Sequence, residues 1–321
     1  MYNSKFKNLT KWQYAIMIFI MVFVWALAFP FIKIGLQELS FVNLTIMRFF
    51  VVCIIFSTIL VLKRQWFSKI RKKDIIPIFL LGFFGVIIYH LGLNYGEQFI
   101  SAGAASLIIA TIPIFITILA MIFLKERIGL IKISGITLSL FGVIIISLWG
   151  TEDASIEIKY MYAALMVLIA AIMGAIYTIA GKKLLERYNG LSLTAYAILL
   201  GSASLIILII LSNLGLDFFN NKPLMEEVTM MSINGWIAII FLGAFSTVLG
   251  YVIWYVALET KTASELSIYL YAIPVLSTII SYILFNDEIT ILYILGGIFV
   301  IIGLLIVNLK TRKINDKKLI K

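Results

Sequence analysis

The fold is decided by the stretch SAGAASLIIATIPIFITILAMIFLKERIGLIKISGITLSLFGVIII, which begins at Ser101, because the chain repeats it from Thr262 as TASELSIYLYAIPVLSTIISYILFNDEITILYILGGIFVIIGLLIV. One offset of 161 residues aligns the two copies at Ala102 and Ala263, Pro113 and Pro274, Thr117 and Thr278, Gly135 and Gly296, and Gly142 and Gly303. The same offset aligns Leu81-Gly82 with Leu242-Gly243. Each copy holds five long apolar segments. Because five is odd, the second copy enters a membrane from the opposite side, which predicts an inverted repeat around a central site.

Composition excludes a soluble protein. Hydrophobic residues make up 62% of the 321 positions and charged residues 13%, against about a quarter charged in soluble domains. Ten apolar segments approach the length that crosses ~30 Å of hydrocarbon, and we expect helices because lipid offers the backbone no hydrogen-bond partners. The predicted fold is therefore an all-α polytopic membrane protein with ten transmembrane helices at 13–34, 41–62, 75–95, 101–123, 130–149, 160–181, 192–212, 235–257, 263–285 and 290–309.

The basic residues predict the orientation of these helices. With the N-terminus inside, 22 of the 26 Lys and Arg residues fall on inner segments, including the tails at 1–12 and 310–321. This asymmetry follows the positive-inside rule, so we expect a multi-pass protein of the cell membrane with both termini cytoplasmic. The net charge of +10 then reflects topology and contact with anionic membrane lipids, and it requires no nucleic-acid partner.

The repeated stretches resemble the EamA-type repeat of the drug/metabolite transporter superfamily. They share with it small residues, a proline in mid-helix, a glutamate at the helix end (Glu126 and Glu288) and a following helix that carries glycines. Lys33 and Lys182, and Thr45 and Thr194, extend the match at an offset of 149 residues. The resemblance implies two repeats, at 13–149 and 160–309, packed around a central cavity. It also implies a secondary transporter of small metabolites, with amino acids and their efflux as the expectation.

Arg48 and His90 are candidate substrate-binding residues because ionisable groups at membrane depth are expensive. Arg48 could attract a substrate carboxylate, pair with Glu38, or serve as a structural anchor. His90 shares a helical face with Asn94 and Glu97. This polar stripe could bind substrate, carry a proton through His90, or form an interhelical hydrogen-bond cluster.

Aromatic residues supply the other candidates. At the 161 offset Tyr251 and Tyr255 replace His90 and Asn94, with Trp254 beside them. One hypothesis is that the two sets bound opposite ends of one cavity, and the alternative is an aromatic belt at the membrane interface. Trp25, Tyr177, Tyr269 and Tyr271 could line the cavity or simply pack.

Pro113 and Pro274 lie in mid-helix and are expected to kink their spans, as hinges or as fixed bends. No Asp or Glu lies near the middle of any predicted span, which disfavours proton-coupled expulsion of lipophilic cations. A facilitator, or coupling through His90, stays open.

Three functions remain in view: a metabolite transporter, a carrier of lipids or lipid-linked intermediates, and a membrane scaffold without transport. We expect no enzyme activity, cofactor or metal, because nucleotide-binding, zinc and hydrolytic motifs are missing from the sequence. The partners expected are a small-molecule substrate and membrane lipids. The sequence leaves monomer and homodimer open, since close glycine pairs such as Gly92 and Gly96 serve either internal packing or a dimer.

Overall fold

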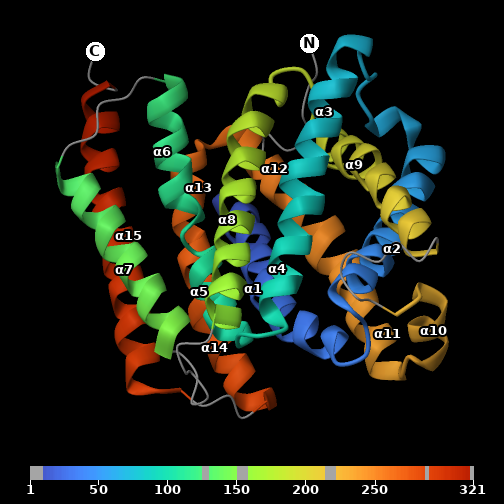
Figure 1. Cartoon of the computed structure of the whole chain (residues 1–321). Coiled ribbons are helices and arrows are strands. Elements are labelled where there is room, and N and C mark those ends of the chain that lie inside the picture. The colour runs from blue at the N-terminus through green and yellow to red at the C-terminus, as the bar shows by residue number, and fades with distance from the viewer. Residues whose placement is uncertain (1–9, 125–129, 150–157, 214–221, 286–288, 319–321) are drawn as a thin grey trace.

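The computed structural model describes residues 10–124, 130–149, 158–213, 222–285 and 289–318. Their helices follow the ten predicted spans (Figure 1). Seven helical stretches among these residues are long and apolar enough to cross a membrane, and three shorter apolar helices, at 133–146, 269–285 and 291–303, account for the fifth, ninth and tenth spans. Glu126 and Glu288, the predicted helix-end glutamates, lie outside the described residues.

The first half of the chain contains α1 (Lys11–Leu36), α2 (Phe41–Leu62), the short 3₁₀ turns η2 (Arg64–Trp66) and η3 (Lys72–Asp74), α3 (Ile75–Gly82), the π-helix η4 (Phe83–Ile88), α4 (Tyr89–Glu97), α5 (Ala102–Ile109), α6 (Ile112–Leu124) and α7 (Leu130–Trp149). The second half contains α8 (Ile158–Leu184), α9 (Gly190–Asn213), α10 (Leu224–Met230), α11 (Ile233–Ile240), the π-helix η5 (Phe241–Leu249), α12 (Gly250–Thr260), α13 (Ala263–Ser267), the 3₁₀ turn η6 (Ile268–Tyr271), α14 (Ala272–Phe285) and α15 (Ile291–Lys318). Of these helices, α10 is one that the sequence did not predict.

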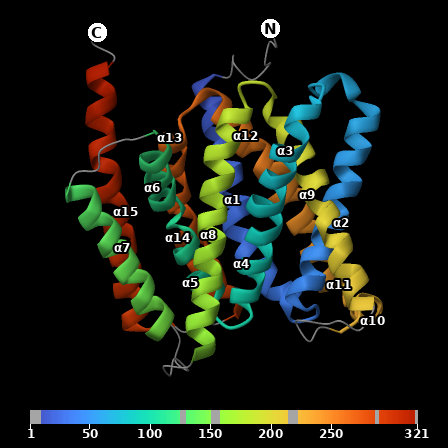
Figure 2. The same ribbon diagram turned by 45° about the horizontal axis from the view of Figure 1, so that its top comes forward.

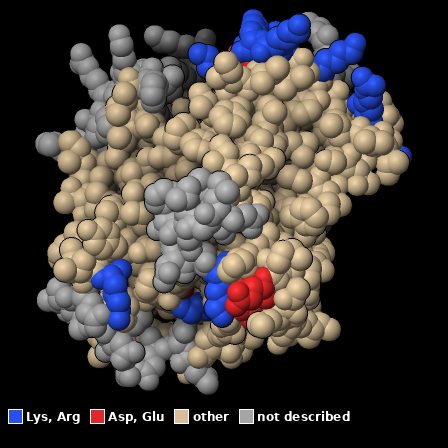
Figure 3. Space-filling model, turned by 45° about the vertical axis from the view of Figure 1, so that its right-hand side comes forward, with Lys and Arg blue, Asp and Glu red and all other residues tan. Residues whose placement is uncertain are grey.

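The start of α1 and the end of α15 lie at one end of the bundle, which we call the termini end (Figure 1). Lys and Arg side chains gather at the same end (Figure 3). The connection between α2 and α3, which carries a run of basic residues, lies there as well. The distribution of charge along the sequence thus becomes a charged end in three dimensions.

The α7 and α15 helices lie side by side at one edge of the bundle, while α2 and α9 lie at the other (Figures 1 and 2). Gly142 of α7 lies against the main chain of Gly296, and Gly303 of α15 lies against the main chain of Gly135. In the repeat, Gly135 is equivalent to Gly296 and Gly142 is equivalent to Gly303. In the structure, the glycine nearer the N-terminus of each helix contacts the glycine nearer the C-terminus of the other helix. The two helices therefore pack antiparallel through equivalent surfaces, as an inverted repeat requires.

Both mid-helix prolines follow a break in their span. Regular α-helix stops at Ile109 and resumes at Ile112, immediately before Pro113. In the ninth span the turn η6 precedes Pro274. A proline removes a backbone donor and crowds the preceding turn, which accounts for the interruption of regular α-helix before each proline, while the kinks themselves stay a prediction.

The third and eighth spans share another irregularity. Their π-helical segments, η4 and η5, include the equivalent residues 83–88 and 244–249. A π-helix replaces the hydrogen bonds between residues four apart by bonds between residues five apart, which widens the turn, and such segments occur frequently at functional sites. Both segments lie beside the centre of the bundle.

Candidate functional site

A cavity with a volume of about 80 Å³ lies between the two halves of the chain. Residues from the first, second, third, fourth, sixth, eighth and ninth spans line it. Its polar and aromatic lining consists of Trp25, Phe29, Arg48, Tyr89, His90, Ser106, Tyr177, Thr178, Ser246, Tyr251 and Trp254. Apolar side chains make up most of the rest, so the cavity has few polar groups and each has a defined position, as in many small-molecule sites.

Arg48 is the charged residue of this lining, and its side chain is only 2% exposed. The Nε atom donates to Thr247 Oγ1 at 2.8 Å, and Nη2 donates to Ser246 Oγ at 3.1 Å. Among the described residues, Nη1 has no hydrogen-bond partner. The guanidinium is therefore held by two bonds and offers a third nitrogen to a ligand. The alternative that Arg48 pairs with Glu38 is wrong, because Glu38 accepts hydrogen bonds from the N–H and hydroxyl of Ser232.

The π-helix η5 holds both Arg48 and Trp25 in place. Thr247 accepts from Arg48 and donates to the carbonyl of Leu242, five residues earlier, at 2.8 Å. The indole Nε1 of Trp25 donates to the carbonyl of Ser246 at 3.0 Å. In a regular α-helix that carbonyl would accept from the main chain. The widened turn thus supplies the groups that orient the arginine and the tryptophan.

The polar stripe predicted on the third span lies in the interior. His90 is 1% exposed and lines the cavity, and its Nδ1 lies 2.6 Å from the carbonyl of Val86. A carbonyl only accepts, so Nδ1 carries the proton and Nε2 of the neutral ring is an acceptor. Asn94 donates to Thr45 at 2.9 Å and does not line the cavity. Glu97 lines a different hollow, described below.

Tyr251 and Trp254 line the same cavity as His90. The rings of His90 and Tyr251 are 6.0 Å apart, so the hypothesis that these two bound opposite ends of the cavity is wrong. The interface-belt alternative also fails, since both aromatic residues are buried. Tyr255 is buried as well, but it donates to the carbonyl of Tyr177 at 2.9 Å and lies outside the lining.

The other predicted aromatic residues divide between cavity and surface. Trp25 and Tyr177 line the cavity, and Trp25 packs at 5.7 Å from Tyr251 and 5.6 Å from Trp254 between ring centres. Tyr269 is 44% exposed and does not line it. The sequence reasoning missed Tyr89, Ser106, Thr178 and Ser246.

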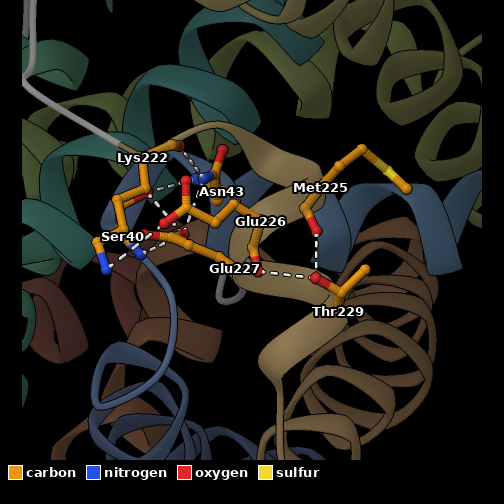
Figure 4. Close-up of polar contacts among 7 residues, drawn as sticks. All are labelled: Ser40, Asn43, Lys222, Met225, Glu226, Glu227 and Thr229. Carbon is orange, nitrogen blue, oxygen red and sulfur yellow. Dashed lines mark hydrogen bonds and ion pairs between the residues drawn. The ribbon is translucent and has the colours of Figure 1, made fainter.

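A second hollow, of about 650 Å³, opens at the end of the bundle opposite the termini. We call it the vestibule. Its charged lining is Lys33, Glu38, Glu97, Lys222, Glu226 and Glu227. Figure 4 shows how Glu227 holds its wall together, by accepting from Ser40 N at 2.9 Å and from Asn43 Nδ2 at 2.8 Å.

Glycines of the third span pack against α8. A side chain on Gly92 would meet the carbonyl of Met166, and one on Gly96 would meet Val167. Of the two roles left open for this pair, internal packing is the one that the structure contains.

Comparison with known proteins agrees with this architecture. A solved crystal structure aligns with a TM-score of 0.62 and 16% identity, over 95% of this chain and 99% of that one, and at this identity the likeness shows the fold alone. An Archaeoglobus fulgidus protein described as an uncharacterized transporter is 37% identical, over 92% of this chain and 98% of its own length. The Bacillus subtilis transporter YdfC, also described as uncharacterized, is 33% identical over 92% of this chain and 91% of its own length.

A further relative from Streptantibioticus cattleyicolor, described as a probable terminal-alkyne amino-acid exporter, is 27% identical over 90% of this chain and 91% of its own length. The profile of the EamA-like transporter family matches this chain twice, at residues 12–148 and 161–309. Together with the apolar helices, these matches make the protein an integral multi-pass membrane protein. The chain belongs to the EamA-like transporter family.

Proposed function

We propose that the protein carries small carboxylate-bearing metabolites, amino acids among them, across the cell membrane by alternating access to the central cavity. The observation that carries this proposal is Arg48, which lines the cavity and whose Nη1 atom has no partner among the described residues. A carboxylate is the group that a guanidinium binds best, through charge-assisted hydrogen bonds. Leaving a buried donor unpaired is costly, so a ligand that pairs it binds with a gain.

The walls of the cavity support the same class of solute. Trp25, Tyr177 and Tyr251 contribute aromatic surface to the cavity that Arg48 lines, while His90 and Thr178 add polar groups. A small amino acid has the carboxylate for Arg48 and a short side chain for a cavity of about 80 Å³. A lipid-linked substrate would need more room, and a scaffold would have no use for an uncommitted buried charge.

The proposal includes the orientation of the protein in the membrane and the direction of transport. The gathering of Lys and Arg at the termini end supports a cytoplasmic location for both termini. With that orientation the vestibule faces outward. Efflux is supported by the exporter description of the Streptantibioticus cattleyicolor relative.

The test is counterflow in liposomes that contain the purified protein and are preloaded with one unlabelled solute. The labelled panel is alanine, serine, threonine and pyruvate, with alaninamide as the analogue that lacks the carboxylate. We expect transient accumulation of at least one carboxylate and none of alaninamide. Accumulation of alaninamide equal to that of alanine, or of no solute by folded protein, would contradict the proposal.

A further inference from the structure

Glu97 carries a buried carboxyl group, and it is not part of the lining of the central cavity. Its side chain is 0% exposed, and neither oxygen has a hydrogen-bond partner among the residues that the structure describes. The other acids of the vestibule are committed: Glu38 to Ser232, Glu227 to Ser40 and Asn43, and Glu226 to Lys222. Burying an ionised carboxylate without hydrogen-bond partners costs much free energy, whereas burying a protonated carboxyl group costs far less.

Two cations act on the carboxyl group of Glu97. Lys33 donates to the main-chain carbonyls of Glu97, at 3.0 Å, and of Ile100, at 3.3 Å. Its charge and that of Arg48 both attract the carboxylate. The titratable or charged groups around Glu97 are Lys33 on α1, Arg48 on α2, Tyr89 on α4 and, around the vestibule, Glu38, Lys222, Glu226 and Glu227. Arg48 lines the cavity together with Leu93 of α4, and Glu97 lies one helical turn beyond Leu93, so the charge of Arg48 acts on both the cavity and Glu97.

We propose that Glu97 is a proton-binding site coupled to the substrate through Arg48, so that a carboxylate substrate and a proton bind together. The proposal rests on the proposed function, because it takes Arg48 as the carboxylate site. While the cavity is empty, the positive charge of Arg48 stabilises the ionised form of Glu97. A substrate carboxylate on Nη1 cancels that charge and adds its own repulsion, so Glu97 takes up a proton from the vestibule.

The sign of the effect follows from linkage. If the substrate favours protonation of Glu97, then protonation favours the substrate by the same factor. Substrate affinity therefore rises as the pH falls through the range in which Glu97 titrates, by up to about tenfold per pH unit for one coupled proton. A monocarboxylate that moves with one proton carries no net charge. Transport of pyruvate then responds to a pH gradient and not to the membrane potential.

Glu97→Gln tests this directly, because glutamine copies the protonated carboxyl group in shape and charge. The measurement is the dissociation constant for labelled alanine and labelled pyruvate, on the full-length protein in lipid nanodiscs, between about pH 5 and about pH 8. In the wild type we expect tighter binding toward low pH. In Glu97→Gln we expect the low-pH affinity of the wild type at every pH. Glu226→Gln, which changes an exposed acid of the same vestibule, should keep the wild-type dependence.

His90, which lines the central cavity, is the second titratable group that we test as the proton carrier. A pH dependence that persists in Glu97→Gln and disappears in His90→Gln would overturn the proposal and assign the proton to His90. Binding that is independent of pH in the wild type would overturn it as well. Weaker binding in folded Glu97→Gln at every pH would indicate a structural role and also contradict it.

A second measurement does not depend on the variant. Wild-type protein in weakly buffered solution should take up a proton when saturating pyruvate is added, and a pH-sensitive dye follows this uptake. Binding without proton uptake would contradict the coupling while leaving the proposed function intact. Failure of the proposed function itself is recognised separately, as the absence of alanine and pyruvate binding at any pH.

Discussion

Lys33 and Lys182 occupy equivalent places in the two halves of the chain and make equivalent hydrogen bonds at opposite ends of the bundle. Lys33 donates to the carbonyls of Glu97 and Ile100, just after the third span. Lys182 donates to the carbonyls of Leu258 and, at 2.9 Å, of Lys261, where the eighth span ends. The acceptors are also equivalent, at the offset of 161 residues. Each lysine therefore satisfies orphan carbonyls at a helix C-terminus, where a positive charge is favourable.

Replacing either lysine by methionine keeps the length of the side chain and removes both hydrogen bonds. We expect Lys33→Met and Lys182→Met each to lower the free energy of unfolding by about 1–2 kcal/mol, since both side chains are partly exposed. Thermal unfolding in detergent measures the loss. Lys183→Met, at the exposed neighbouring position, is the control. Equal stability of all three variants would contradict the capping role.

Gly250 allows Trp25 to reach the centre of the cavity. A Cβ atom on Gly250 would lie 3.0 Å from Trp25 Cδ1 and closer still to Nε1. Gly250→Ala should therefore displace the indole and break its bond to Ser246, and we expect counterflow to fall more than about tenfold. Gly297→Ala is the control, because Gly297 does not line the cavity and its Cβ would only reach ordinary contact with Leu107, at 3.6 Å. Wild-type transport by a folded Gly250→Ala protein would show that the position of Trp25 is unimportant.

Glu227 fastens α10 to the start of α2 (Figure 4). Its carboxylate lies at the N-terminal end of a long helix, where negative charge is favourable, and it accepts from Ser40 and Asn43. We expect Glu227→Ala to lower the free energy of unfolding by about 2 kcal/mol and to speed amide exchange in α10. Glu226→Ala removes only an exposed ion pair of 3.8 Å with Lys222, for which we expect about 0.5 kcal/mol or less. The attachment would be refuted if the two substitutions had the same effect.

The opposite end of the bundle has a corresponding attachment built from different residues. Asn189 and Ser192, the equivalents of Ser40 and Asn43, bond to Trp66 and Ser68 in the connection between α2 and α3. There Tyr188 donates to Asp74 at 2.9 Å, and burial raises the pKa of Tyr188. The repeat thus keeps the positions of these contacts and changes the residues that make them, and a carboxylate stands at the start of the helix in both halves, Glu227 at α2 and Glu259 at α9.

Much of the fold was predictable because it depends on hydropathy, repeat spacing and proline. The ten spans follow from these features alone, whereas the kinks at Pro113 and Pro274 and the division into repeats at 13–149 and 160–309 stay predictions. The site was harder, because periodicity gives the depth of a residue more reliably than the direction it faces. His90 and Asn94 share a helical face in the sequence, yet in the structure only His90 reaches the cavity.

The missed residues had a signal in the repeat. Tyr89 is equivalent to Gly250 at the offset of 161 residues, and Trp25 is equivalent to Gly174 at the offset of 149 residues. Both of these large residues in the first half therefore have a glycine at the equivalent position in the second half. In the structure Trp25 lies against Gly250 and Tyr89 lies against Gly174. Comparing side-chain size across the repeat would have found Tyr89. Ser246 carried no such signal, since its role depends on the π-helix, which spacing does not reveal.

The central claim is that Arg48 binds the carboxylate of the transported solute. Arg48→Lys keeps the charge but removes the planar fork through which a guanidinium binds a carboxylate with two hydrogen bonds. The most direct measurement is the KM for alanine counterflow by wild type and Arg48→Lys, in liposomes with equal amounts of folded protein. We expect a KM at least about tenfold higher for the variant, a loss of about 1.4 kcal/mol in binding. An unchanged KM for alanine in Arg48→Lys would contradict it.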